Sequence, residues 1–401
     1  MNGRVLRINR PGRSDSLKKV IWIGFFVRLF ALLFMLTIAV GWTRPYFITD
    51  DIKYDNLAES YLLGAGGLID IPLFQSITAG FMQPFWPWVM CISAYLFRNI
   101  YAARFINIIL STLCIGKIYD LTYRISQNEK TANTAAGLFA FLPVTVLTCC
   151  FPIKDIFLTY AVLYAFEMFV QFQSDGKVAT KRILLCVALL VGVYFTRGAV
   201  TELLLLFFVV YLLQGYLRNR RYFAAVGACL VCLVLAVVFK DSVLESFEIK
   251  LDDYSSYAMA EGGISLLNMR SLLQLYKMPG AYFFATLQPM KTSLAFTRSS
   301  SWWLNIICYL NISIYPIAIG NFLYIFSKKK NFFFWLSSLI MYCAIIYLVL
   351  GVFRHYLFLL PVELINYSLY KEQKKDSLHM LTFASLGLFV LILALNALSV
   401  F

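Results

Sequence analysis

Charged residues are scarce in this chain, and histidine is scarcer still. Asp, Glu, Lys and Arg together make up only 14% of the 401 residues, and two residues are histidine. A soluble globular protein carries about 25% charged residues, so the composition excludes an ordinary soluble domain. The nine cysteines are scattered, mostly inside apolar runs, and they lack metal-ligand spacing. We therefore interpret them as small buried apolar residues.

Long apolar runs, separated by short polar breaks, dominate the chain instead. Hydrophobic residues make up 61% of the sequence. About 20 apolar residues are needed to cross the hydrocarbon core of a membrane, and a spanning helix closes its backbone hydrogen bonds internally. The pattern predicts an all-α, polytopic helical membrane protein with about eleven transmembrane helices in a single transmembrane domain, residues 1–401. The predicted spans are residues 20–42, 101–123, 132–150, 156–173, 183–196, 199–217, 222–239, 303–327, 332–352, 356–370 and 377–399.

Basic residues lie in short clusters between the apolar runs, which is how a membrane protein fixes its orientation. For this reason we do not interpret the net charge of +14 as a nucleic-acid-binding signal. With the N-terminus in the cytoplasm, every short cytoplasmic segment carries at least two Lys or Arg residues, as the positive-inside rule requires. These segments are residues 1–19, 124–131, 174–182, 218–221, 328–331 and 371–376. The working surface is then expected on the non-cytoplasmic face.

Two long segments, 43–100 and 240–302, lie on that outer face. In the first, residues 52–63 fit an amphipathic juxtamembrane helix, with Ile52, Leu57, Tyr61 and Leu62 available to the membrane. Residues 82–97 form a short apolar run with two prolines near its start, where a helix tolerates proline. We predict a second helix there, lying in the outer interface. Segment 240–302 shows no catalytic signature and is predicted to close over a site or bind an acceptor.

Ionisable side chains gather on the predicted outer face, at the ends of several spans. Charged groups near membrane depth cost several kcal/mol unless they are paired or face water, so they are functional candidates. A structural interpretation exists for each of them: acids at a helix N-terminus, a local ion pair, arginines that reach the interface, or a structural histidine. The candidates are Asp50, Asp51, Asp55, Arg104, Lys154, Asp155, Arg197, Arg354 and His355.

Taken together, these groups suit an anionic phosphate substrate. Arginine offers planar, bidentate contacts to phosphate. A nearby carboxylate can act as general base on an acceptor hydroxyl or amine. The surrounding apolar helices are suited to a lipid tail.

Several short motifs occur in an order that resembles a known family. An acidic pair follows the first span, a proline-rich stretch comes next, an arginine and an asparagine open the second span, and a proline and a second acid follow. In this sequence the motifs read Asp50-Asp51-Ile52-Lys53-Tyr54 with Ala58, Leu62 and Gly64, then Gln83-Pro84-Phe85-Trp86-Pro87, Ala102-Ala103-Arg104 with Asn107, Pro143, Asp155, and Arg354 before Pro361. The chain resembles the GT-C superfamily of integral-membrane glycosyltransferases, especially the bacterial branch similar to protein O-mannosyltransferases and lipid A aminoarabinose transferase.

The resemblance implies a GT-C-like fold and a polyprenyl-phosphate-linked sugar as donor. It implies Asp50 as the catalytic carboxylate, with Asp51 as a close second, and a role for Asp155 in binding the acceptor or a divalent metal ion such as Mg or Mn, together with Asp50. The remaining candidates, with Tyr54 and Gln83, would bind substrate. Two positions depart from the family pattern. Gln83 stands where the family has a basic residue, and Lys154 stands where a Thr or Ser often precedes the second acid.

The hypothesis that follows is an inverting glycosyltransferase of the bacterial plasma membrane, working at the periplasmic or extracellular face on a lipid, glycan or protein acceptor. A polymerase of lipid-linked surface-polysaccharide repeat units shares the same location and substrates, and differs in its acceptor. A transporter or flippase of a lipid-linked or anionic substrate is an alternative of another class. Transporters often have internal repeats and ionisable groups near the midplane, which here would be Glu202 and Glu363. No repeat is visible in the sequence.

Overall fold

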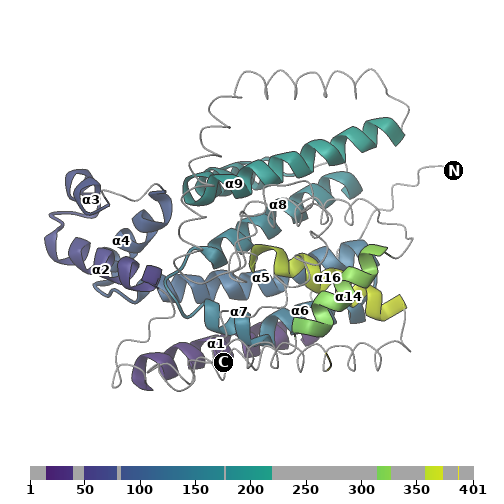
Figure 1. The fold of residues 1–401 in the computed structure, drawn as a ribbon, viewed down its shortest axis with the longest axis horizontal. Coiled ribbons are helices and arrows are strands. Elements are labelled where there is room, and N and C mark those ends of the chain that lie inside the picture. The colour runs from purple at the N-terminus through teal and green to yellow at the C-terminus, as the bar shows by residue number, and fades with distance from the viewer. Residues whose placement is uncertain are drawn as a thin grey trace, which may run out of the picture. The chain divides into compact units, whose positions relative to one another are not determined.

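The computed structural model describes residues 15–38, 49–78, 83–175, 178–218, 314–326, 357–373 and 387. Every regular element in this part of the chain is helical, as predicted. The helices are α1 (Asp15–Ile38), α2 (Thr49–Gly64), α3 (Ile71–Ile77), α4 (Phe85–Phe97), α5 (Ala102–Ser126), α6 (Glu129–Phe141), α7 (Pro143–Thr148), α8 (Asp155–Asp175), α9 (Thr180–Arg218), α14 (Ile314–Phe326) and α16 (Leu360–Gln373). Figure 1 shows α2, α3 and α4 grouped beside the bundle that contains α1, α5 and α6.

Three of the described helices are long and apolar enough to cross a membrane, over Asp15–Thr37, Ala102–Ser126 and Asp155–Phe172. They coincide with the first, second and fourth predicted spans. Trp22, Phe26 and Phe30 form an exposed aromatic row on the first of them, as expected of a surface in contact with lipid. The full count of eleven spans is not tested, because the spans predicted at 222–239 and 332–352, nearly all of 377–399, and the loop 240–302 lie outside the described residues.

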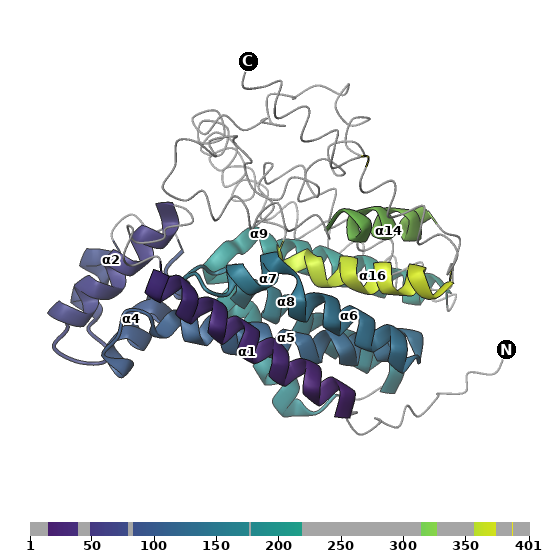
Figure 2. The ribbon, with the colours of Figure 1, turned by 90° about the horizontal axis from the view of Figure 1, so that it is seen from below.

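The described residues fall into two compact units. The first includes Met1–Gly198, Thr292–Tyr324 and Leu357–Phe401, and the second includes Ala199–Lys291 and Ile325–Tyr356. All the contacts discussed below lie within the first unit. In that unit α1, α6 and α16 lie alongside one another around α5, as Figure 2 shows.

The predicted third span, 132–150, is interrupted rather than continuous. α6 ends at Phe141, Leu142 adopts an extended conformation with φ −65° and ψ 123°, and α7 begins at Pro143. Proline has no backbone N–H and clashes with the preceding turn, so it ends α6 at this point. The break leaves carbonyl groups at the end of α6 without helical partners, in apolar surroundings where no water replaces them.

Arg28, in the middle of α1, supplies the missing donors. Its guanidinium is fully buried and makes five hydrogen bonds, equal to its number of N–H groups. NH1 donates to the carbonyl of Ala140 at 2.8 Å, and NH2 donates to the carbonyl of Phe139 at 3.1 Å. The C-terminal end of a helix also carries partial negative charge, which stabilises a cation there. The remaining bonds go to Ser111 Oγ, Thr145 Oγ1 and the carbonyl of Gly24.

Replacing Arg28 with methionine is therefore expected to destabilise the protein, although it removes a buried charge. The Ala140 carbonyl loses its donor, and a buried unsatisfied group costs about 1–3 kcal/mol. We expect the free energy of unfolding to fall by about that amount, measured by thermal unfolding of the detergent-solubilised protein. Phe30→Met, on the exposed face of the same helix, is the matched control. An unchanged or higher unfolding temperature for Arg28→Met contradicts this account.

The first outer segment contains both predicted helices, but one faces differently from the prediction. α4 begins directly after Pro84 and has Pro87 in its first turn, as expected. In α2, Leu57 and Tyr61 were predicted to face the membrane, yet they are 5% and 0% exposed. These two side chains are buried because α4 packs against the apolar face of α2. The opposite face is exposed as predicted, for example at Lys53 and Asn56.

Candidate functional site

Three helices of the bundle carry charged residues at two levels. Arg104, Asp155 and Arg197 lie at one level, on α5, α8 and the first part of α9. Lys117, Glu167 and Arg182 lie about 12–15 residues away on the same helices, after the first-level residue in α5 and α8 and before it in α9, and so about 18–22 Å from it. They form the opposite cluster, in which Glu167 bonds both Lys117 and Arg182. Thus α5 and α8 run parallel, and the first part of α9 runs the other way, as the predicted alternation of spans requires.

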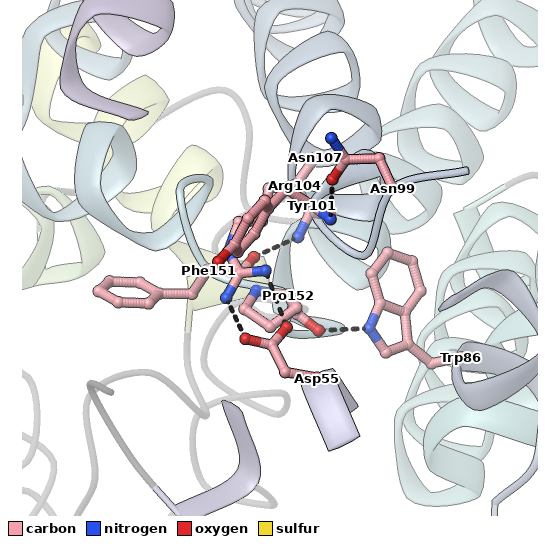
Figure 3. Close-up of polar contacts among 8 residues, drawn as sticks. All are labelled: Asp55, Trp86, Asn99, Tyr101, Arg104, Asn107, Phe151 and Pro152. Atoms are coloured by element: carbon pink, nitrogen blue, oxygen red, sulfur yellow. Dashed lines mark hydrogen bonds and ion pairs between the residues drawn. The ribbon is translucent and has the colours of Figure 1, made fainter. Parts of the chain in front are cut away.

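Asp55 and Arg104 form a buried, bidentate ion pair. Arg104 NH1 donates to Asp55 Oδ1 at 2.8 Å, and NH2 donates to Oδ2 at 2.7 Å (Figure 3). Both residues are at most 6% exposed, and the guanidinium also lies 4.9 Å from the ring of Tyr101. Removing one partner of such a pair is strongly destabilising, because the other charge stays buried. The pair therefore fixes α2 against the start of α5, and it occupies both carboxylate oxygens of Asp55.

The segment between α7 and α8 is held by three consecutive carbonyl groups. Asn107 Nδ2 donates to the carbonyls of Phe151 and Ile153, at 2.8 and 2.9 Å. Trp86 Nε1 donates to the carbonyl between them, that of Pro152, at 2.8 Å. Figure 3 shows both side chains reaching this segment from different helices. The backbone is thus fixed immediately before Lys154 and Asp155.

The acceptors of Lys154 include two oxygens from distant parts of the sequence. Its Nζ donates to Gln83 Oε1 at 3.2 Å and to the carbonyl of Thr196 at 3.3 Å. The Thr196 carbonyl is available because the backbone of α9 is non-helical at Arg197, with φ −164° and ψ 87°. The end of the preceding helical stretch, where carbonyls lack partners, also favours a cation. This interruption falls between the predicted spans 183–196 and 199–217.

Asp155 and Arg197 face each other without closing a hydrogen bond. Arg197 NH1 lies 3.9 Å from Asp155 Oδ1, which is beyond hydrogen-bond distance. Both residues are buried, and neither of these two atoms has a hydrogen-bond partner in the described part of the chain. A hydroxyl oxygen about 2.8 Å from each atom fits this spacing, because it can donate to the carboxylate and accept from the guanidinium.

For most of the remaining predicted site residues, the structure does not describe the side chain. Asp50 and Asp51 lie in the first turn of α2, one turn before Tyr54 and Asp55, but their side chains lie outside what the structure describes. The Tyr54 side chain is buried. Arg354 and His355 lie outside the described residues.

Glu202 and Glu363 are the acids that a transporter would use, and the structure describes only the second side chain. Glu363 is buried in the first turn of α16, and the side chain of Glu202 is not described.

The predicted ligands of a divalent cation are Asp50 and Asp155, and because the side chain of Asp50 is not described, this site stays a prediction. The guanidinium of Arg197 lies 3.9 Å from Asp155 Oδ1, and a fixed positive charge disfavours a second cation at the same oxygen. No group of three or more His, Cys, Asp or Glu side chains suited to a metal occurs within the ranges that the structure covers.

Aromatic side chains of α4 and α8 pack against one another. Phe85 and Phe157 have ring centroids 5.2 Å apart, and Trp86 stacks on Phe157 at 6.0 Å. Gly192 of α9 lies directly against them. A Cβ at Gly192 would lie 2.9 Å from Phe157 Cζ and 3.0 Å from Phe85 Cζ. The absent side chain therefore lets α9 approach α4 and α8 closely, one turn before Thr196.

Gly192→Ala is expected to separate these helices. Overpacking of this kind typically costs about 1–3 kcal/mol, and we expect that loss in the free energy of unfolding. Gly137→Ala in α6 is the matched control, because nothing lies within 4 Å of its added Cβ. Alanine is the better helix former, so the control should be neutral or stabilised by up to about 1 kcal/mol. Equal thermal unfolding of the two variants would show that the contact at Gly192 is not tight.

Several important residues were missed by the sequence reasoning. Trp86 and Asn107 were quoted only as parts of motifs, and Arg28 lay unremarked inside the first span. Arg28 was nevertheless detectable, because an arginine in the middle of an apolar run is costly without partners. Lys117 and Glu167 carry the same signal, because they lie inside the predicted spans 101–123 and 156–173, but the sequence does not show that they pair with each other and with Arg182.

No protein-family model matches the chain, and no curated protein matches its sequence. Among solved structures, the chain is similar to the crystal structure of the Archaeoglobus fulgidus oligosaccharyltransferase in the apo form, with a TM-score of 0.45 and 15% identity. The similarity covers 93% of this chain and 54% of the archaeal chain, so the chain spans about half the length of that protein. A likeness at this level defines neither the fold family nor the activity.

Proposed function

We propose that the protein is a GT-C-type membrane glycosyltransferase. It transfers a sugar from a polyprenyl-phosphate-linked donor to a lipid, glycan or protein acceptor at the outer face of a bacterial plasma membrane. The observation that carries this proposal is the cluster of Lys154, Asp155 and Arg197. Two cations and one carboxylate, from the start of α8 and the break in α9, meet at one end of α8, which is long and apolar enough to cross a membrane. Such a set suits a lipid-linked phosphate and a polar acceptor together.

In the proposed reaction, an acceptor hydroxyl attacks the anomeric carbon of the donor sugar. A new carbon–oxygen bond forms as the bond to the lipid phosphate breaks, and the configuration inverts. The acceptor proton passes to a carboxylate, for which Asp50 is the first candidate and Asp51 the second. Asp155 orients the acceptor. The phosphate leaves with the bonding electrons, and fixed cations stabilise the charge that builds on it.

The cations for that phosphate are best sought at Lys154 and Arg197. Arg104 was also predicted to contact it, but both of its terminal nitrogens are engaged by Asp55. We therefore assign the Asp55–Arg104 pair to holding α2, and with it Asp50 and Asp51, against the start of α5. Among the acceptors of Lys154 are the neutral oxygens of Gln83 and Thr196, at 3.2 and 3.3 Å, and we assign its cation to the phosphate.

The two departures from the GT-C pattern support this assignment, because they are in contact. The family's basic residue before the prolines is replaced by Gln83, and the small hydroxyl residue before the second acid is replaced by Lys154. Lys154 Nζ lies 3.2 Å from Gln83 Oε1. Compared with the family pattern, the positive charge of this contact is therefore at position 154 instead of position 83.

The activity named for the similar archaeal structure, oligosaccharyl transfer, belongs to the same general class, although the proposal rests on the residues above. The repeat-unit polymerase differs from it only in the acceptor. Nothing among the described contacts favours the transporter alternative specifically.

The acids are tested by transfer of radiolabelled sugar from polyprenyl-phosphate donors to an acceptor in membrane extract. Loss of a general base typically costs about 10²–10⁴-fold in rate. We expect a loss of that size for Asp50→Asn, or for Asp51→Asn if it is the base, and a clear loss for Asp155→Asn. Asp15→Asn is the control, because its described polar contact is an exposed one to Lys18.

Wild-type activity in Asp50→Asn, Asp51→Asn and Asp155→Asn alike would remove the proposed site. Transport measurements on Glu363→Gln would then be the appropriate next step, because Glu363 is the described acid buried in α16.

Exchanging the residues at positions 83 and 154 tests the relocated charge. Lys154→Thr alone removes the cation, and we expect transfer to fall by at least about tenfold, as for one lost electrostatic contact in a transition state. The double variant Gln83→Lys, Lys154→Thr restores the family pattern and should recover most of that activity. Double and single variants that are equally impaired, while both remain folded, contradict a shared role for the two positions.

A further inference from the structure

One turn of α5 holds both backbone segments that carry the candidate acids. Arg104 and Asn107 are three residues apart, so they lie on the same face of the helix. Arg104 bonds Asp55 of α2, the helix that begins with Asp50 and Asp51. Asn107 bonds the segment that leads into Asp155. The positions of the two acidic segments relative to each other are therefore set by a single helical turn.

The contacts to residues 151–153 are more than ordinary packing. Asn107 and Trp86 are 0% and 1% exposed, and both direct their N–H groups at consecutive carbonyls of one segment. Asn107 Oδ1 is buried and has no hydrogen-bond partner in the described part of the chain. An unsatisfied buried oxygen is costly, so the residue is disadvantageous for stability in this respect. Its two N–H bonds to the segment are what justify an asparagine there.

We propose that Asn107 and Trp86 are positioning residues: they hold the backbone of residues 151–153 so that Lys154 and Asp155 present their side chains to the site. The inference rests on the proposed function as far as the reaction is concerned. Its geometric part is independent of that function. Neither residue touches the reacting atoms, and both act through the backbone that precedes Lys154.

The geometric part is tested by NMR of protein labelled with ¹⁵N-tryptophan. Trp86→Phe identifies the Trp86 indole signal by its loss. In the wild type this signal should exchange slowly with water, because the indole N–H is buried and bonded to Pro152. Asn107→Asp replaces both N–H donors with a carboxylate of the same shape. We expect it to shift the Trp86 signal and accelerate its exchange, because both residues hold one segment.

Asn99→Asp is the control for this measurement. It keeps the side-chain oxygen that accepts from the Tyr101 N–H, and we expect the Trp86 signal to stay in place. Asn107→Ala serves the same purpose as Asn107→Asp if the new carboxylate prevents folding. An unmoved Trp86 signal in a folded Asn107 variant overturns the proposal.

The catalytic part is tested by comparing Trp86→Phe with Trp88→Phe. Trp86→Phe removes the indole N–H together with part of the bicyclic ring, and Trp88→Phe removes the same atoms, so the comparison isolates the site of the loss. Trp88 lies in the same helix and stacks on Phe74, away from the held segment. Small misplacements of reacting groups cost about 100-fold, so we expect kcat to fall by about 10- to 100-fold in Trp86→Phe, with KM for the donor changed less than about twofold. Trp88→Phe should retain the wild-type kcat.

The outcomes distinguish the positioning role of Trp86 from the proposed glycosyltransferase activity. Equal kcat in folded Trp86→Phe and Trp88→Phe overturns the positioning role, even if Trp86→Phe is less stable. A wild-type protein that transfers no sugar from any donor counts against the proposed function. In that case the NMR comparison still decides whether Asn107 and Trp86 act on one segment.

Discussion

Carbonyl groups that are released where helices break must find donors inside the protein, because hydrocarbon offers none. This constraint recurs three times in the described part of the chain. Arg28 donates to the carbonyls at the end of α6, Asn107 and Trp86 donate to those between α7 and α8, and Lys154 donates to Thr196 at the interruption of α9. In each case a side chain from a distant part of the sequence completes the backbone hydrogen bonding.

The same breaks create the candidate site. A continuous helix through residues 142–154 would bond its carbonyls internally and leave none for Asn107 and Trp86 to hold. A continuous α9 would likewise leave the Thr196 carbonyl bonded within the helix. The interruptions instead bring Lys154, Asp155 and Arg197 together. Irregular backbone at membrane depth is tolerated only where protein or a polar cavity surrounds it. The polar side chains that satisfy the broken helices therefore also make this part of the protein polar.

The fold class and several elements were predictable, because they depend on local pattern. Apolar runs identify α1, α5 and α8, and Pro84 marks the start of α4. The grouping of Lys154, Asp155 and Arg197 at one end followed from the alternation of spans. The partners of individual side chains did not follow. Asp55 was predicted to bind substrate, whereas its oxygens are engaged by Arg104, 49 residues away in sequence. Periodicity identifies an apolar face on α2, but it does not distinguish a cover of lipid from a cover of α4.

The position of Arg28 has a consequence for biosynthesis. Its acceptor Ala140 follows 112 residues later, and at ribosomal rates of about 5–20 residues per second that separation takes about 6–22 seconds. During this interval the first helix has emerged with a charged side chain in its middle and without the carbonyls that will receive it. The nascent helix must therefore wait in a wet or protein-lined environment, such as the insertion machinery, until α6 and α7 arrive. Final burial of the first helix thus becomes a late step of assembly.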